Sequence, residues 1–241
     1  MSMFTVDCHT HILPCIDDGS RSVDDSVQMI RMEQQQGVNR IFLTPHFRAQ
    51  HSNPDTFIQK RNSAMDILMD ALATEPNIPL LIPGAEVSYC PGMSKWEALD
   101  SLTIGDTGCL MIEMPAQSWS ERVLSELESI YYERGITPII AHVERCFHPF
   151  FLNMTLRKFT SLPVLFQMNC SFLIERKTRR MALKIIKEHN VHLFGSDCHS
   201  STWRAPNIGA ARTILSEHFD ADTLSFLSGL EEMVTQGSAR T

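Results

Sequence analysis

Short apolar runs alternate along the chain with polar loops and longer segments of helical period. The runs have the length of buried strands, and the longer segments space apolar residues as amphipathic helices do. Strands are predicted at Phe4–Cys8, Arg40–Thr44, Pro79–Ala85, Cys109–Glu113, Pro138–His142, Val164–Asn169 and His192–Gly195. Helices are predicted at Val23–Gln36, Asp55–Ala73, Glu121–Arg134, Thr178–Asn190, Ala205–Ser216 and Asp222–Leu230. This alternation is typical of an α/β fold with a mainly parallel sheet.

The turn after the first strand distinguishes between two such folds. A doubly wound sheet normally has a glycine-rich turn there, whereas this chain continues as Asp7-Cys8-His9-Thr10-His11. An irregular barrel with seven strands rather than eight is therefore the better prediction. The length of 241 residues suits one domain over residues 1–241.

Composition excludes several classes of protein. The chain has 21 Lys and Arg against 28 Asp and Glu, a formal net charge of −7, so no basic excess favours nucleic acid or anionic membranes. The N-terminus lacks the basic segment of a signal peptide, and no apolar run reaches the ~20 residues of a membrane span. Seven cysteines without regular spacing indicate free thiols. We therefore expect a cytoplasmic protein with no membrane span.

Groups that can bind metal follow six of the seven predicted strands. Parallel barrels build their active sites from the loops at this one rim. The strand ends carry, in chain order, His9 and His11 with Asp17 and Asp18 in the following loop, His46, Glu86, Glu113, His142, and Asp197 with His199. Each of these alone is equally well read as a polar loop residue or an exposed acid. Their concentration at one rim predicts a metal centre.

The spacing of these groups has a physical meaning. Residues i and i+2 of a strand point to the same face, about 6–7 Å apart, so His9 and His11 can converge on one ion. Asp197 and His199 can reach neighbouring ions in the same way. Mixed imidazole and carboxylate ligands suit Zn, Mn, Fe or Ni, and the lack of an all-cysteine set argues against a structural thiolate site.

The combined motifs resemble the PHP (polymerase and histidinol phosphatase) superfamily. They are Asp-x-His-x-His with a trailing Asp-Asp-Gly, Pro-His, Gly-Ala-Glu, Ile-Glu, Ala-His-x-Glu-Arg and Ser-Asp-x-His. The segments around His11–Gly19 and Ile140–Arg145 look most like the bacterial capsule-synthesis tyrosine phosphatases of the CpsB/YwqE type. The resemblance runs from Asp7 to about Arg204 and implies a distorted (β/α)7 TIM-like barrel with three divalent metal ions, often manganese.

The same resemblance implies a role for each ligand. The first ion would be held by His9, His11, Glu86 and Asp197. The second would share Glu86 and add Glu113 and His142, and the third would take Asp18, His46 and His199. Asp7 is expected to accept a hydrogen bond that fixes an imidazole tautomer rather than to bind metal.

The implied activity is hydrolysis of phosphotyrosine by metal-activated hydroxide. Arg145 and Arg204 are the candidate phosphate-binding and catalytic residues, because guanidinium forks match phosphate oxygens. Arg48, His51 and Trp203 are weaker candidates for substrate contact. The implied partner is the tyrosine-rich tail of a bacterial tyrosine kinase that regulates capsule or exopolysaccharide synthesis.

Three alternatives remain at this point. The same chemistry would suit histidinol phosphate or another small phosphoester, and a PHP domain can also bind metal without turnover. Cysteine-based phosphatases use Cys-x5-Arg, which occurs here from Cys15 to Arg21, Cys170 to Arg176 and Cys198 to Arg204. The acids in the first loop, the absence of glycine in the second and His199 in the third argue against phosphate binding in each.

Overall fold

The computed structural model describes residues 5–115, 120–146, 162–188 and 191–236. Its strands run in parallel pairs and are β1 (Val6–Thr10), β2 (Arg40–Leu43), β3 (His46–Phe47), β4 (Leu80–Pro83), β5 (Glu86–Ser88), β6 (Cys109–Glu113), β7 (Thr137–Ile140), β8 (Leu165–Asn169) and β9 (Leu193–Gly195). Within the described residues, each predicted strand is present, and its ends lie within two residues of the predicted ends. Phe4, the predicted start of the first strand, lies outside the described residues. The prediction of a mixed α/β fold with a parallel sheet is confirmed.

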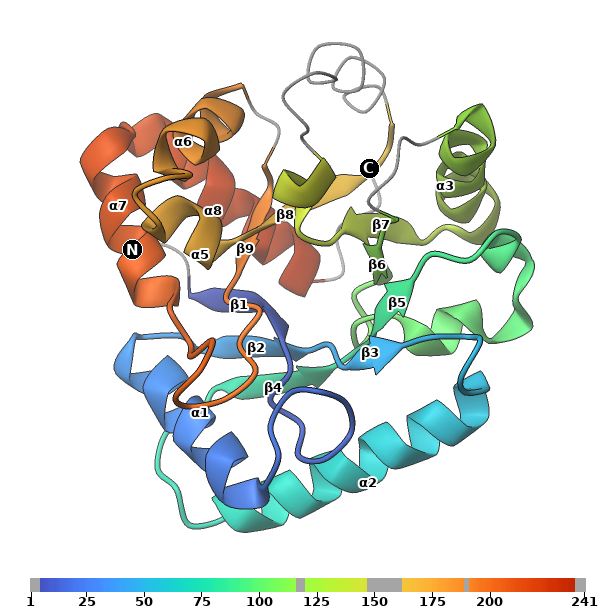
Figure 1. Ribbon diagram of the computed structural model, residues 1–241, viewed down its shortest axis with the longest axis horizontal. Coiled ribbons are helices and arrows are strands. Elements are labelled where there is room, and N and C mark those ends of the chain that lie inside the picture. The colour runs from blue at the N-terminus through green and yellow to red at the C-terminus, as the bar shows by residue number, and fades with distance from the viewer. Residues whose placement is uncertain (1–4, 116–119, 147–161, 189–190, 237–241) are drawn as a thin grey trace.

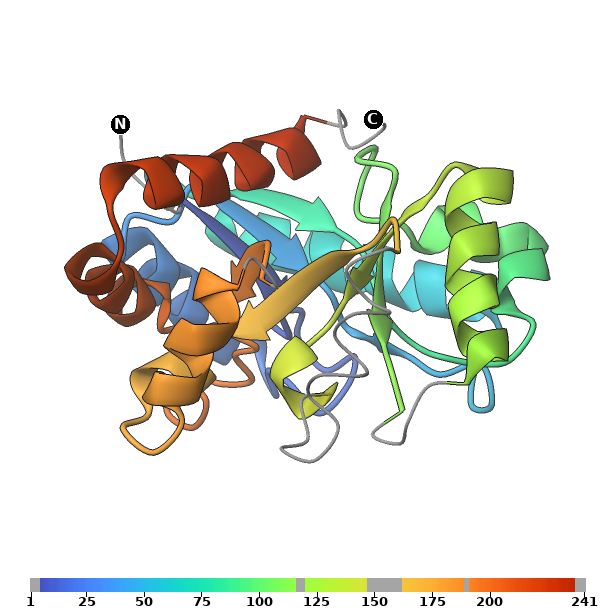
Figure 2. The ribbon, with the colours of Figure 1, turned by 90° about the horizontal axis from the view of Figure 1, so that it is seen from above.

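The strands form one strongly curled surface (Figures 1 and 2). One part has the order β4-β2-β1 and the other the order β3-β5-β6-β7-β8-β9. An isolated parallel bridge between Thr10 and Cys198 links β1 to the segment that follows β9. On the other side, the chain passes directly from β2 into β3 and from β4 into β5.

These two direct passages differ from the prediction, which has a single strand in each place, Arg40–Thr44 and Pro79–Ala85, and none at β3 or β5. Pro45 lacks an N–H for the ladder, and the chain leaves the pairing of β2 there before resuming as β3. At Gly84 a Cβ would lie 2.9 Å from the Ile104 side chain, so only glycine fits this crossing. Each break changes the direction of the chain that follows it. As a result, His46 and Glu86 lie opposite each other in the β3–β5 register.

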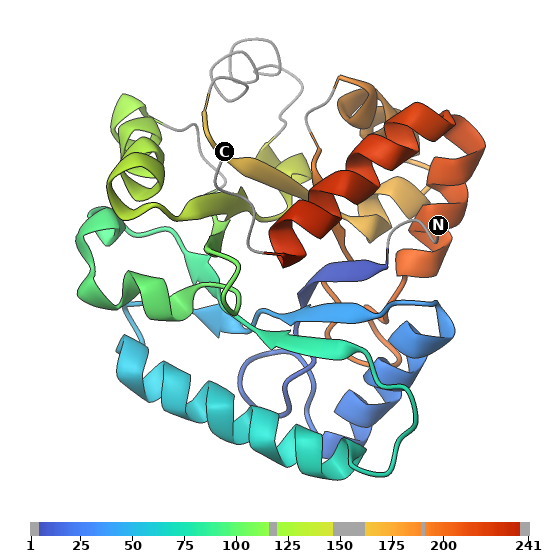
Figure 3. The ribbon, with the colours of Figure 1, turned by 180° about the vertical axis from the view of Figure 1, so that it is seen from behind.

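The helices cover the outside of the curled sheet (Figures 1 and 3). Their bounds are α1 (Val23–Gln35), α2 (Pro54–Leu72), α3 (Glu121–Arg134), α5 (Cys170–Ile174), α6 (Arg179–Lys187), α7 (Ile208–His218) and α8 (Ala221–Thr235), with 3-10 turns η1 (Met93–Lys95), η2 (Glu97–Leu102) and η3 (Val143–Cys146). The predicted helices are all confirmed in the described residues, although Asn190 lies outside them. The short α5 and the 3-10 turns were not predicted, because they have less than two turns of periodic pattern.

Local sequence explains where the main helices begin and end. Ser22 accepts a hydrogen bond from Asp25 N at the start of α1, and Asn53 accepts one from Thr56 N before the proline that opens α2. Gly135 ends α3 in the left-handed conformation with φ 65°. No helix in the described residues is both long and apolar enough to cross a bilayer.

Two layers of apolar side chains form the core. One lies between the strands and the outer helices, and the other fills the inside of the curl. The inner layer includes Val6 and Cys8 of β1 and is closed by Val234 of α8, which crosses the end opposite the strand exits (Figure 2). The strand exits are therefore the open rim, and α8 seals the other end.

Candidate metal centre

The nine predicted ligands all lie at the rim formed by the carboxyl ends of the strands. Ligand atoms of His11, Asp18, His46 and His199 lie within 4.8 Å of one another, as do those of His9, His11 and Glu86 and those of His46, Glu86 and Glu113. His142 and Asp197 adjoin these groups: His142 Nε2 is 2.7 Å from Glu86 Oε1, and Asp197 Oδ1 is 3.4 Å from His11 Nε2. The strand exits thus bring together the full predicted set.

At the centre of this group two imidazole nitrogens face each other. His9 Nε2 and His11 Nε2 are 3.1 Å apart, and Glu86 Oε2 lies 3.4 Å from both. The other ring nitrogens have acceptors, since His9 Nδ1 is 3.1 Å from Gln167 Oε1 and His11 Nδ1 is 2.7 Å from Asp17 Oδ2. If each Nδ1 carries the proton, both Nε2 lone pairs point at the same place.

Two converging lone pairs beside a buried carboxylate need a positive charge between them. Burial opposes protonation of the His11 ring, but hydrogen bonds to Asp17, Asp197 and Glu86 outweigh it and hold the His11 pKa well above its ordinary range. Glu86 is fully buried, yet the charge and hydrogen bonds of the surrounding histidines hold its pKa well below its ordinary range. The donor set therefore fits a divalent cation, which would replace that proton.

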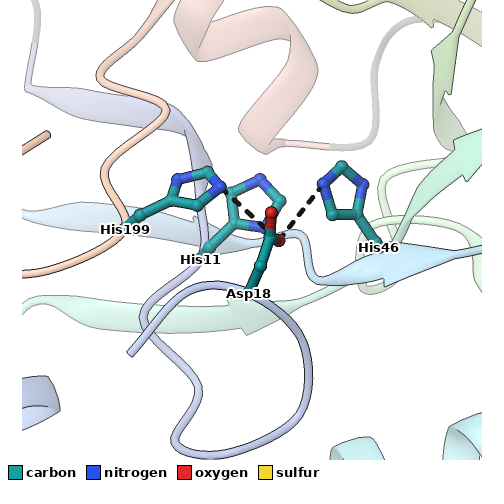
Figure 4. A group of neighbouring side chains, drawn as sticks. All are labelled: His11, Asp18, His46 and His199. Carbon is teal, nitrogen blue, oxygen red and sulfur yellow. Dashed lines mark ion pairs between the residues drawn. The ribbon is translucent and has the colours of Figure 1, made fainter. Parts of the chain in front are cut away.

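A second part of the centre contains the exposed carboxylate of Asp18. Asp18 reaches between two rings (Figure 4), with Oδ1 3.5 Å from His46 Nε2 and 3.7 Å from His199 Nε2. The His199 ring is fixed by Nδ1, 3.0 Å from the Asp197 carbonyl oxygen. Burial and the neighbouring His11 charge lower the His199 pKa to about 4, so the imidazole is neutral and can act as a ligand at neutral pH.

Backbone conformations at two of these positions are unusual. His142 has φ 36° and Asp197 has φ 52°, values that non-glycine residues seldom adopt. Each is the second residue after the end of a strand, His142 after β7 and Asp197 after β9. Such conformations persist only where the surroundings fix them, and they concentrate at functional sites.

The two candidate arginines border the centre. The Arg145 guanidinium, on η3, is half exposed and lies 3.6 Å from both Glu113 Oε1 and Asp197 Oδ2. Arg204 is paired closely with Asp197 Oδ2, and its Nη1 is 3.2 Å from His199 Nε2. Both guanidinium groups therefore stand at the edge of the ligand cluster, within reach of a phosphoryl group bound there.

Sequence reasoning missed an amide network below the ligands. Gln167 Oε1 accepts from His142 N at 2.8 Å and faces His9 Nδ1, while Gln167 Nε2 donates to Asn169 Oδ1 at 3.0 Å. Asn169 Nδ2 then donates to Asp197 Oδ2 at 2.7 Å. Two buried amides thus connect His9, His142 and Asp197. The sequence does contain a sign of this network, because Gln167 and Asn169 are two polar residues at i and i+2 in an otherwise apolar strand.

Asp7 has a different role from the one predicted. Its Oδ1 accepts from the main-chain nitrogens of His9, at 3.2 Å, and Ser196, at 2.9 Å. The imidazole tautomers are set instead by Asp17 and Gln167. The reason is a register irregularity of β1 between Asp7 and Thr10, which breaks the simple alternation of faces.

The cysteines of the Cys-x5-Arg spacings do not form a phosphate cradle. Cys170 and Cys198 are fully buried, and burial raises the pKa of both thiols well above the ordinary range. Cys15 is exposed, but its Sγ donates to the Arg21 carbonyl oxygen at 3.1 Å. A nucleophilic thiolate needs a lowered pKa, so the metal interpretation is the stronger one.

Comparison with known proteins agrees with this geometry. The family model described as capsular polysaccharide synthesis, CpsB/CapC, matches residues 5–230. The tyrosine-protein phosphatase YwqE of Bacillus subtilis (strain 168) is 26% identical over 247 residues, covering 95% of this chain and 91% of that protein. The tyrosine-protein phosphatase CpsB of Streptococcus agalactiae serotype III is 25% identical over 224 residues, covering 89% and 90%.

A solved structure shares the fold. It belongs to the crystal structures of YwqE from Bacillus subtilis and CpsB from Streptococcus pneumoniae, described as unique metal-dependent tyrosine phosphatases. The TM-score is 0.82 at 23% identity, and the match covers 96% of this chain and 94% of that one. A phosphotriesterase homology protein from Escherichia coli, with phosphate in its active site, is more distant, with a TM-score of 0.56 at 9% identity.

Proposed function

The chain belongs to the CpsB/CapC family of capsular polysaccharide synthesis, and from this premise we propose that it is a metal-dependent protein-tyrosine phosphatase. The observation that carries the proposal is the pair of imidazole nitrogens, His9 Nε2 and His11 Nε2, that converge beside the buried Glu86 carboxylate at the open rim. Relatives over nearly the whole chain are named tyrosine-protein phosphatases, which supports the same activity.

We infer three divalent ions, with manganese the first choice and iron, zinc or nickel as alternatives. His9, His11, Glu86 and Asp197 would hold the first, and Asp18, His46 and His199 the third. Glu86 would also hold the second, together with Glu113 and His142. When bound, such ions supply an activated water as nucleophile and neutralise phosphoryl oxygens.

The chain's own residues supply orientation and charge. Asp17 and Gln167 keep the Nδ1 protons of His11 and His9 in place, so that each Nε2 stays available as a donor atom. Arg145 and Arg204 would bind the non-bridging oxygens of the phosphoryl group. Both are already held beside ligand carboxylates, so little side-chain freedom remains to be lost when the substrate binds.

The proposal extends to fold and partner. We infer a single domain over residues 1–241, closed as a distorted (β/α)7 barrel; the bridge between Thr10 and Cys198 supports that closure. The substrate would be a phosphotyrosyl protein, with the tyrosine-rich tail of a bacterial tyrosine kinase that controls capsular or exopolysaccharide synthesis as the first candidate. The family's link to capsule synthesis supports this choice.

The test is metal-dependent hydrolysis of defined phosphoesters. Protein stripped with a chelator is assayed on a phosphotyrosyl peptide and on histidinol phosphate, before and after adding Mn²⁺. We expect the stripped protein to lose at least about 1000-fold in rate, because the nucleophile depends on the metal, and Mn²⁺ to restore it. The peptide should have the higher kcat/KM.

Cys198→Ser separates the metal mechanism from a thiolate mechanism. It should retain the rate, since the Cys198 thiol is buried and stays protonated. Activity that survives chelation but disappears in Cys198→Ser would refute the proposal. A clear preference for histidinol phosphate would retain the metal chemistry and reassign the substrate.

A further inference from the structure

Three cavities open around the rim, and each includes ligands of the metal centre in its wall. The first, of about 460 Å³, is lined by Asp18, His199 and residues 200–203. The second, of about 300 Å³, is lined by Glu113, His142 and Arg145. The third, of about 280 Å³, contains Asp18 and His46 together with Arg48, His51 and Lys60. We call the third cavity the basic pocket.

The cavities differ in the carboxylates that accompany their cations. In the first, Arg21 shares the wall with Asp18 and Asp25 and makes no ion pair among the described residues. In the second, Arg145 lies 3.6 Å from each of two carboxylates. In the basic pocket, neither Arg48 nor Lys60 has a carboxylate within 4.0 Å among the residues that the structure describes. Both side chains are exposed, so their positive charge is available to a ligand.

The carboxylates that line the basic pocket are already engaged. Asp17 accepts from His11 Nδ1 at 2.7 Å and from His46 N at 2.9 Å. Asp18 faces His46 and His199 as a proposed metal ligand. Neither carboxylate therefore neutralises the basic side chains.

A tight turn and a helix start hold those side chains at the pocket. His51 N donates to the Arg48 carbonyl oxygen at 2.9 Å, which keeps the two residues together after β3. Lys60 lies in the second turn of α2, a helix of 19 residues whose positive end adds to the same field. The floor is apolar, with the rings of Phe47 and Phe57 5.1 Å apart.

We propose that the basic pocket is an anion subsite for a second negatively charged side chain on the phosphotyrosyl peptide, either a carboxylate or another phosphate. An apolar floor with a cationic rim suits a side chain that ends in a negative charge. His46 and Asp18 belong both to this pocket and to the metal centre, so the second anion would lie close to the phosphotyrosine in the peptide sequence. The subsite rests on the proposed function.

The experiment compares four peptides that carry one hydrolysable phosphotyrosine. The positions on either side of it hold alanine, lysine, glutamate or a phosphonate analogue of phosphotyrosine that cannot be hydrolysed. We expect kcat/KM for the glutamate and phosphonate peptides to exceed that of the alanine peptide by roughly tenfold, with the lysine peptide lowest. The advantage should shrink as ionic strength rises, because the pocket is open to solvent.

Variants then test whether the preference for acidic peptides depends on the basic pocket. In Arg48→Ala/Lys60→Ala the ratio of the glutamate peptide to the alanine peptide should fall close to one, and Arg48→Glu/Lys60→Glu should favour the lysine peptide. Lys177→Ala/Lys187→Ala removes the same charge from exposed positions outside the pocket and should keep the native ratio. A ratio within each variant cancels any general change in rate.

The outcomes separate the subsite from the proposed function. Hydrolysis of the alanine peptide with equal kcat/KM for all four peptides would overturn the subsite and leave the phosphatase in place. A preference for acidic peptides that persists in the Arg48→Glu/Lys60→Glu variant would also overturn it. If none of the peptides is hydrolysed, the proposed function fails, and the subsite fails with it.

Discussion

Two sets of buried carboxyl groups lie on either side of β1, and they behave in opposite ways. Toward the rim, Glu86 and Asp197 are surrounded by imidazole rings and Arg204, which hold the pKa of both carboxyls below the ordinary range despite burial. On the other side, Asp7 and Glu33 are equally buried, and burial raises the pKa of both. Burial is outweighed in the first set and dominates in the second.

The difference teaches that close donor atoms do not make a metal site. Asp7, Glu33 and Cys198 also bring ligand atoms within 4.8 Å of one another. That group has no imidazole, and burial keeps the Cys198 thiol protonated. A buried cation needs charged or lone-pair donors that the fold holds ready. Of these two groups, the one at the rim provides them. The predictions below test this contrast from the largest expected effect on activity to the smallest.

Removing one imidazole from the rim should have the largest effect. His199→Ala deletes a donor of the proposed third ion, and we expect kcat to fall by at least about 100-fold. The protein should remain folded, since His199 lies at the open rim. Phosphatase assays with circular dichroism and metal analysis check both expectations.

A matched control is His218→Ala. His218 caps the last turn of α7 through the Ile214 carbonyl oxygen at 2.9 Å, away from the ligand cluster. It should keep the native rate. A folded His199→Ala protein with full metal content and the native rate would remove His199 from the site.

Replacing the arginines at the edge of the rim should have the second-largest effect on activity. If Arg145 and Arg204 bind the phosphoryl group more strongly as its charge redistributes, each alanine variant loses kcat and kcat/KM together, by about 2 kcal/mol. Lysine should rescue poorly, because a point charge cannot replace a planar fork. Steady-state kinetics would contradict this role if KM alone rose while kcat stayed constant.

The sequence was enough to predict most of the helices and strands and to place the nine proposed ligands at one rim, because both depend on local pattern. Strand length, helical period and the residue at each strand exit can all be recognised in the sequence. The bend at Gly84 was not predicted, since it follows from the close approach of Ile104, 20 positions away. Gln167 and Asn169 were missed because their importance lies in partners 25 to 158 positions away. Asp7 was misassigned because alternation fails at the irregularity in β1.

The amide network offers a subtler way to disturb the rim. In Asn169→Asp the retained Oδ1 still accepts from Gln167 Nε2, but the donor to Asp197 is replaced by an oxygen that repels it. We expect metal affinity to fall about tenfold, with a smaller loss of rate at saturating metal. Titration with Mn²⁺ followed by electron paramagnetic resonance measures it.

Asn62→Asp adds the same charge on the exposed side of α2 and is the matched control. It should leave the affinity unchanged. If Asn169→Asp binds Mn²⁺ as tightly as the native protein does, the network is a structural feature of the core and does not position Asp197.

The smallest effect on activity should come from Glu231 of α8, a third buried carboxyl whose pKa is raised by burial. This carboxyl accepts from Thr5 N at 3.2 Å. Burial raises its pKa to about 8, against the opposing effects of the hydrogen bond from Thr5 and the positive charge of Arg212. An unfolded glutamate titrates near 4.5. The folded state therefore binds the proton more tightly, and its stability falls as pH rises from about 4.5 to about 8.

Glu231→Gln keeps the acceptor and cannot ionise, so it should match the native Tm at pH 5 and exceed it by a few degrees at pH 8. Glu232→Gln, exposed and next in sequence, should show no such divergence. Identical Tm curves for the native and Glu231→Gln proteins from pH 5 to pH 8 would mean that Glu231 is charged when buried, and the contrast between the two sides of β1 would fail.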